Sequence, residues 1–78
     1  MKYYEPVKNM TQAYHKDSSG NEYFGMAARG ATTAKAVWVI YRIKYTGDNW
    51  IIEFAEGTDA PKFIWDSVES YTYSLLGT

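Results

Sequence analysis

The stretch IYRIKYTGDNWIIEFAEG, residues 40–57, decides the fold of this chain. It contains two apolar strands on either side of a polar turn, in which Gly47 and Asp48 form a two-residue loop. Glycine at the first loop position is what a type II′ turn requires, because φ is positive there. The turn sets the register of the hairpin and predicts the cross-strand pairs Tyr45–Trp50, Ile43–Ile52 and Tyr41–Phe54. All six side chains then lie on one face, which the pattern predicts to be the core, and a slip of one residue would destroy this arrangement.

The same register places Arg42 opposite Glu53 on the other face of the hairpin. Opposite charges that face each other across two strands stabilise a sheet by about 0.2–1 kcal/mol. The sequence therefore predicts a structural ion pair between these two residues.

The residues just before this hairpin, 37–40, are apolar on both faces of the expected strand. A strand that is apolar on both faces is typical of a central position in a sheet. Trp38 and Ile40 lie on the face opposite the main apolar stripe, so a further element has to cover them. Three candidates remain open: the other hairpin, the segment FIW at residues 63–65, and another subunit.

A second hairpin is predicted upstream, around a turn at residues 17–20. Asp17 at the first turn position and Gly20 at the fourth suit a type I turn that continues into a bulge. Pairing Asp17 with Asn21 then sets Tyr14 opposite Phe24, an aromatic pair that favours this register.

The C-terminal third supplies a loop and one more strand. Residues 57–66 contain Pro61 and read as a loop with a short turn, whereas residues 69–76 alternate between apolar and polar positions. Such alternation is typical of a half-buried strand. The total is about five strands with almost no helix, which predicts an all-β fold, a small antiparallel β-barrel or sandwich.

The N-terminus differs from the rest of the chain. Residues 1–11 have no clear period and contain Pro6, so we expect an extended N-terminal arm. Residues 12–78 are expected to form a single small β domain.

The composition points to assembly. A chain of 78 residues buries only about 60–65% of its unfolded surface, so its stability margin is thin. Cysteine is absent and there is one histidine, which excludes disulfides, thiolate metal sites and paired-histidine metal sites. Aromatic residues make up 18% of the chain, and such residues dominate protein interfaces. We therefore expect contacts with neighbouring chains through Tyr3 and Tyr4 on the arm and through Trp38 and Ile40.

Several function classes are disfavoured. His15 stands beside a turn, and neither it nor the isolated glycines form a catalytic or phosphate-binding pattern, so we expect no enzyme, no cofactor and no small-molecule substrate. No apolar run is long enough for a membrane span, and the first residues lack a secretory signal, so synthesis in a cytoplasm is expected.

Nucleic-acid binding is the alternative function. Small barrels bind single strands by stacking bases on aromatic rings beside basic residues, and Trp38, Tyr41 and Tyr45 are interleaved with Arg42 and Lys44. A net charge of −1 argues against a general nucleic-acid binder, which normally carries a basic excess.

The runs YFGMAARGATTAKAVWVIYRIKYTGDNWIIEFAEG, residues 23–57, and FIWDSVESYTYS, residues 63–74, add a resemblance. Their pattern of strand and turn residues resembles a group of short virion-associated proteins encoded among the structural genes of tailed bacteriophages. The resemblance covers about two thirds of the chain. It implies a non-enzymatic structural or accessory protein of the virion: a capsid decoration, neck or tail component. Its partners would be other virion proteins and copies of itself, and it would be made in the bacterial host cytoplasm. The alternative is a small β-barrel protein of a phage or prophage that binds nucleic acid or has a regulatory role.

Overall fold

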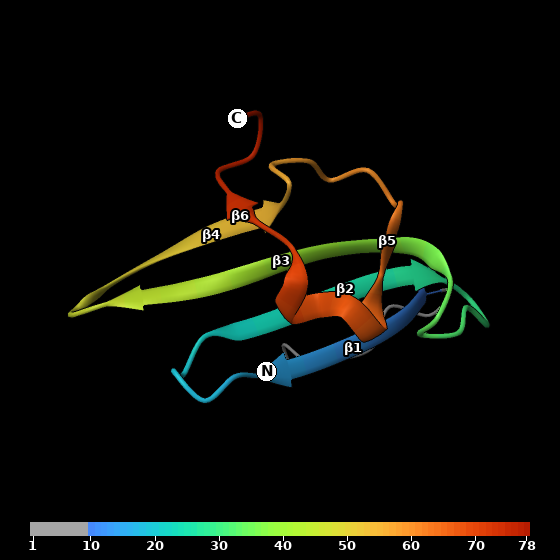
Figure 1. Cartoon of the computed structure of the whole chain (residues 1–78), viewed down its shortest axis with the longest axis horizontal. Coiled ribbons are helices and arrows are strands. Elements are labelled where there is room, and N and C mark those ends of the chain that lie inside the picture. The colour runs from blue at the N-terminus through green and yellow to red at the C-terminus, as the bar shows by residue number, and fades with distance from the viewer. Residues whose placement is uncertain (1–9) are drawn as a thin grey trace.

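The structure is a computed structural model that describes residues 10–78, and these residues form six strands and one 3₁₀ helix (Figure 1). The first four strands make an antiparallel meander in which each pairs with the next. The sheet has the order β1-β2-β3-β4-β6, and β5 pairs with β3. The elements are β1 (Met10–Lys16), β2 (Glu22–Ala28), β3 (Ala36–Thr46), β4 (Asn49–Ala55), β5 (Phe63–Ile64), η1 (Trp65–Ser70) and β6 (Tyr73–Ser74).

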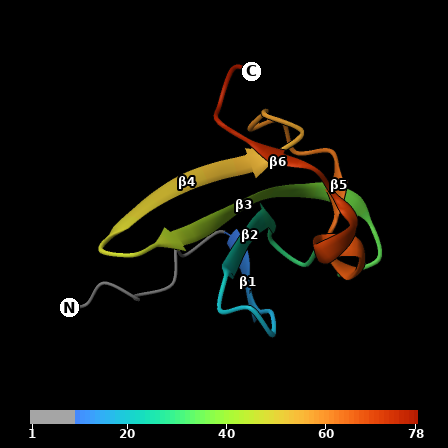
Figure 2. The same ribbon diagram turned by 60° about the vertical axis from the view of Figure 1, so that its left-hand side comes forward.

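The prediction of an all-β fold is confirmed, and the sheet is open. Figure 2 shows β4 and β6 together at one side of the molecule and β1 at the other, in agreement with the strand order. Closure into a barrel, or pairing with a second sheet as a sandwich, stays a prediction.

Both hairpins have the predicted register. In the first, Tyr14 lies opposite Phe24, and the Asp17 side chain accepts hydrogen bonds from the backbone N–H groups of Ser19 and Asn21 at 2.9 and 3.0 Å. In the second, Gly47 has a φ of +62°, as the first position of a type II′ turn requires. All three predicted apolar pairs of this hairpin are present, namely Tyr41–Phe54, Ile43–Ile52 and Tyr45–Trp50.

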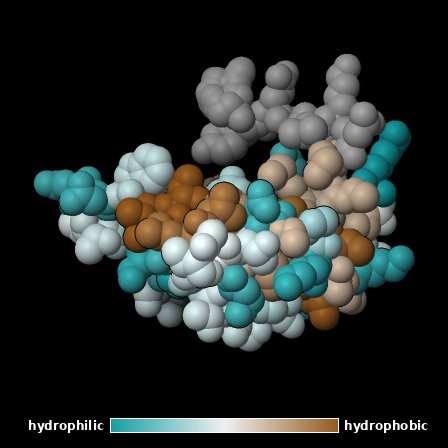
Figure 3. Space-filling view, turned by 90° about the horizontal axis from the view of Figure 1, so that it is seen from above, coloured by the Kyte–Doolittle hydropathy of each residue, from teal (hydrophilic) through white to brown (hydrophobic). Residues whose placement is uncertain are grey.

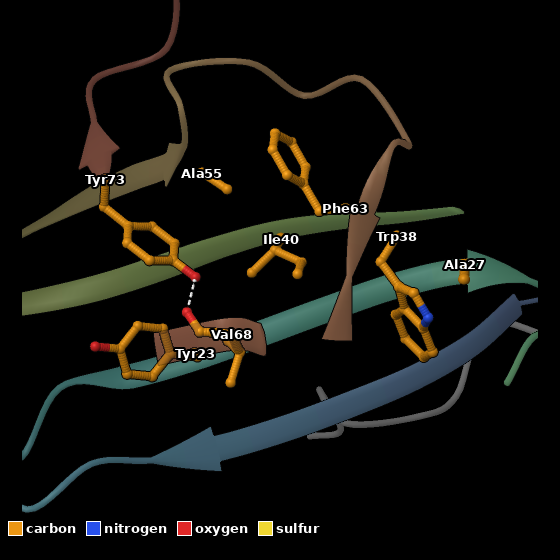
Figure 4. Packing of buried hydrophobic residues seen from close by; sticks show 8 residues of the cluster. All are labelled: Tyr23, Ala27, Trp38, Ile40, Ala55, Phe63, Val68 and Tyr73. Atoms are coloured by element: carbon orange, nitrogen blue, oxygen red, sulfur yellow. Dashed lines mark hydrogen bonds between the residues drawn. The ribbon is translucent and has the colours of Figure 1, made fainter. Parts of the chain in front are cut away.

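The face that forms the core is the opposite of the predicted one. Of the apolar stripe expected to be buried, Tyr45, Trp50 and Ile52 are 51%, 57% and 39% exposed. The core instead lies on the other face of the sheet, where Figure 4 shows its members: Tyr23, Ala27, Trp38, Ile40, Ala55, Phe63, Val68 and Tyr73. The physical reason is that β5 and η1 provide one covering layer, and this layer packs on the face with Trp38, together with the Tyr73 side chain of the edge strand β6.

The segment at residues 63–65 covers Trp38 and Ile40, one of the three candidates. Phe63 of β5 pairs with Trp38 of β3, and the Trp65 ring centroid lies 5.8 Å from that of Trp38. Both Trp38 and Ile40 are 0% exposed, and the Trp38 indole N–H donates to the Thr32 carbonyl at 3.0 Å. The assignment of Trp38 and Ile40 as interface residues is therefore wrong, because their own chain buries them completely.

The predicted terminal strand over residues 69–76 is also largely wrong. Residues Trp65–Ser70 form η1, and only Tyr73–Ser74 pair with β4. The Tyr73 hydroxyl donates to the Val68 carbonyl at 2.6 Å, which fixes the end of η1 against the core (Figure 4). Strand β4 ends at Ala55, which pairs with Tyr73, so β6 begins there.

The boundary of the predicted arm shifts by two residues. Strand β1 begins at Met10, so Met10 and Thr11, which the sequence assigns to the arm, belong to the sheet. Tyr3 and Tyr4 lie outside the described residues, and their assignment as interface residues stays a prediction.

Candidate functional site

Four aromatic side chains form a continuous row across four strands, on the face of the sheet opposite the core. The register places Tyr14, Phe24, Tyr41 and Phe54 directly opposite one another on β1, β2, β3 and β4. Successive ring centroids are 5.3, 5.3 and 5.5 Å apart, and the Phe24 and Tyr41 rings are stacked with an interplanar angle of 17°. Aromatic pairs at this spacing contribute about 0.5–1.5 kcal/mol each beyond their buried area. We call these four residues the aromatic row.

Further apolar side chains extend the aromatic row toward the β3–β4 turn. Ile43 pairs with Ile52 and Tyr45 pairs with Trp50, all on the same face. Figure 3 views the molecule from above and shows hydrophobic side chains gathered on that side of the surface. We define the open face as Tyr14, Glu22, Phe24, Tyr41, Ile43, Tyr45, Trp50, Ile52 and Phe54.

Glu22 brings a negative charge to this apolar surface. The Tyr14 hydroxyl donates to one carboxylate oxygen and the Tyr45 hydroxyl to the other, both at 2.7 Å. These hydrogen bonds, the one from Tyr45 first, favour the ionised form and lower the pKa of Glu22. Phe24 and Ile43 complete a hollow of about 410 Å³ around the carboxylate. The open face therefore offers a fixed anion among aromatic rings, an arrangement that attracts a cationic group.

The predicted ion pair of Arg42 and Glu53 is present on the core side of the hairpin. The Arg42 guanidinium donates to the Glu53 carboxylate at 2.5 Å and lies 4.9 Å from the Tyr73 ring centroid. The two side chains are 19% and 13% exposed. Burial works to lower the pKa of Arg42, but the hydrogen bonds with Glu53 and Tyr23 outweigh it and raise that pKa. This pair is structural, and it keeps the guanidinium away from the open face.

A second hollow, of about 330 Å³, lies between β1 and η1. It is lined by His15, Trp65, Asp66, Val68 and Glu69. The His15 imidazole contacts the Glu69 carboxylate and thereby links the first strand to η1. Within residues 10–78, no group of three or more His, Cys, Asp or Glu side chains is placed to hold a metal ion.

Reasoning from the sequence missed the open face because it assigned those residues to the core. One signal could have revealed the true core. Gly25 and Ala27 of β2 are small and lie on the face that has to accommodate the indoles of Trp38 and Trp65. Small residues beside large aromatic ones mark a close-packed layer.

The comparisons with known proteins add no relatives to this picture. No protein-family model, curated protein or solved structure matches the chain. In the part of the chain that the structure describes, no helix has the length and apolar character needed to cross a bilayer.

Proposed function

We propose that this protein is a non-enzymatic structural or accessory component of a bacteriophage virion, which docks on copies of itself or on other virion proteins through its open face. The observation that carries the proposal is the open face itself. Trp50 is 57% exposed, and tyrosine and tryptophan are the residues that most often dominate binding energy at protein interfaces. A contiguous exposed apolar surface of this kind marks an interaction site.

The placement in a virion is supported by the resemblance to short structural proteins of tailed phages. The residues that carry the resemblance include Gly25, which leaves room for the indoles, and the turn at residues 46–49. These residues shape the sheet and hence the open face. A partner sheet packed on this face would complete a β-sandwich across two chains, with the two layers about 10 Å apart.

Nucleic-acid binding is the second candidate, and the aromatic row is the observation that favours it. Four rings across a sheet are a surface on which bases can stack. Two observations weigh against it. The Glu22 carboxylate would repel phosphates, and Arg42, expected to lie beside the aromatic side chains, pairs with Glu53 on the other face.

Quantitative mass spectrometry of purified particles tests the proposal. We expect the chain in particles from a host that carries its gene, at a constant ratio to the major capsid or tail proteins and after washing at high salt. Its absence from such particles would refute the virion role. Fluorescence anisotropy with a labelled single-stranded oligonucleotide, at several salt concentrations, tests the alternative, which requires binding that weakens as salt rises.

A further inference from the structure

We propose that residues 1–9 of this chain bind over the open face of the same chain, with a lysine ammonium group close to Glu22. This inference goes beyond the proposed function and does not require a virion. It concerns how the open face is covered before a partner arrives.

The composition of residues 1–9 is complementary to the open face. Tyr3, Tyr4 and Val7 provide apolar side chains for the aromatic row, and Lys2 and Lys8 provide cations. Aromatic pairs at ring contact and the burial of apolar area both favour such an association. The segment therefore carries both kinds of group that the open face can bind.

The charge of Glu22 gives the association a specific anchor. Hydrogen bonds from Tyr45 and Tyr14 hold both carboxylate oxygens in place and favour the ionised form. An ammonium group in this hollow would meet the carboxylate and the faces of aromatic rings together. A cation over such a ring gains about 0.5–2 kcal/mol, more when it is shielded from water.

The length of the segment is sufficient. Strand β1 begins at Met10, and at about 3.3 Å per residue the aromatic row at Tyr14 lies roughly 13 Å further along the strand. Glu22 lies opposite Lys16, roughly 20 Å from Met10 by the same measure. Lys2 stands eight residues before Met10, about 26 Å of extended chain, so the segment can turn back at the start of β1 and bring Lys2 to Glu22. Lys8, two residues before Met10, spans only about 7 Å and cannot reach it.

The tether favours the same chain over a neighbour. A short linker gives a segment an effective concentration of about a millimolar at a site within its reach. A second copy at micromolar concentration cannot compete with that. A docking partner of the proposed function would have to displace the segment, so covering and docking would be mutually exclusive.

The absence of cysteine allows a direct test. Glu5→Cys introduces one cysteine for a nitroxide label and leaves Lys2, Tyr3, Tyr4 and Lys8 unchanged. In the ¹⁵N-labelled full chain we expect the label to broaden the Trp50 indole N–H and the Ile52 amide more than the amides of the loop residues Thr58, Asp59 and Ala60. The same spectrum after reduction of the nitroxide is the reference and also shows that the chain is folded.

A mixed sample separates the same chain from a neighbour. Nitroxide-labelled ¹⁴N protein is combined with unlabelled ¹⁵N protein, and we expect no selective broadening of Trp50 or Ile52. Broadening in this sample would show that the segment of another copy occupies the face, and it would overturn the proposal. Uniform spectra in both samples would overturn it as well, because the segment would then not bind the face at all.

Substitution of Glu22 tests the anchor. Glu22→Gln keeps the size of the side chain and removes its charge, so we expect the selective broadening to fall. Asp66→Asn removes an acid on η1, away from the open face, and is the matched control, with no change expected. Equal broadening in the wild type and in Glu22→Gln would refute the role of the carboxylate. Particle incorporation is a separate readout, so failure of the virion role leaves this test interpretable.

Discussion

At the scale of single residues, Gly25 shows how closely the core is packed. A Cβ atom at this position would lie 2.6 Å from the Trp65 ring and 3.0 Å from the Trp38 ring. We expect Gly25→Ala to lower the free energy of unfolding by about 1–3 kcal/mol, because rigid indoles have to move to admit the methyl group. Urea denaturation measures the effect. In a Trp65→Leu background, Gly25→Ala should lower the free energy of unfolding by less than it does in the wild type. An unchanged urea midpoint for Gly25→Ala would mean that the Trp65 side chain of η1 does not pack closely against β2 in solution.

The ion pair on the core side gives a second prediction at this scale. Arg42→Glu should destabilise the protein by about 3 kcal/mol or more, because it places two carboxylates opposite each other in a mostly buried position. Adding Glu53→Arg should restore part of the loss, although the Tyr73 ring then no longer lies below a guanidinium group. A double variant no more stable than Arg42→Glu alone would show that the pair does not couple. Thermal unfolding monitored by circular dichroism suffices for the comparison.

Asp17 predicts a dependence of stability on pH. Burial works to raise the pKa of its carboxyl, but hydrogen bonds from Tyr23, Asn21 and Ser19 outweigh it and lower that pKa below the ordinary value of 3.8. A carboxyl with a lowered pKa stabilises the folded state above the pKa of the unfolded chain, and this contribution is lost as pH falls through the folded pKa. We therefore expect stability to fall as pH drops below about 4, and to fall less steeply in Asp17→Asn. Urea denaturation at a series of pH values measures both slopes, and identical slopes would contradict this account of Asp17.

At the scale of elements, the turn residues explain why the hairpins could be predicted. Glycine at position 47 and the Asp17 turn each fix a loop length, and the loop length fixes every cross-strand pair. The short elements near the C-terminus could not be predicted in the same way. Their alternation is local, whereas the start of β6 depends on where β4 ends, at Ala55, just before Glu56 and Gly57 with φ of 52° and 69°. That ending follows from contacts that no local pattern contains.

Gly47 provides the prediction for the β3–β4 hairpin. Its φ of +62° costs an L-residue roughly 1–2 kcal/mol, so Gly47→Ala should destabilise the protein by about that amount. Gly47→Asn should cost less, because asparagine tolerates this conformation better. Nothing within 4 Å of the position would obstruct a Cβ, which makes the comparison a test of backbone conformation alone. Equal unfolding midpoints for the glycine and alanine proteins would contradict the assigned turn.

At the scale of the whole molecule, the described residues make one sheet with one covering layer. Alternation along β3 and β4 shows that the two faces differ, but it does not show which of them the rest of the chain will cover. The cover is supplied by β5 and η1, which pack on the face with Trp38 and Ile40, and the Tyr73 side chain of the edge strand β6 joins them. The register and the ion pair were therefore predictable, whereas the identity of the core face and the presence of an open aromatic surface were not.

Two exposed apolar pairs have different expected roles, and this difference supplies matched variants. Trp50 and Ile52 belong to the open face, whereas Leu75 and Leu76, each 53% exposed, follow β6 near the end of the chain. Substituting either pair by serine should change the free energy of unfolding little, because exposed side chains usually contribute within about 0.5 kcal/mol each. Thermal unfolding of both double variants establishes this before function is compared.

The most direct test of the open face as a docking surface is the number of copies per purified particle, measured by quantitative mass spectrometry. We expect the Trp50→Ser, Ile52→Ser protein to be incorporated about tenfold less than the wild type or worse. Losing an interface tryptophan typically costs ~2 kcal/mol or more, and ~1.4 kcal/mol is a factor of ten in affinity. The Leu75→Ser, Leu76→Ser protein should be incorporated at the wild-type level. Wild-type incorporation of the open-face variant would contradict the proposed role of this surface.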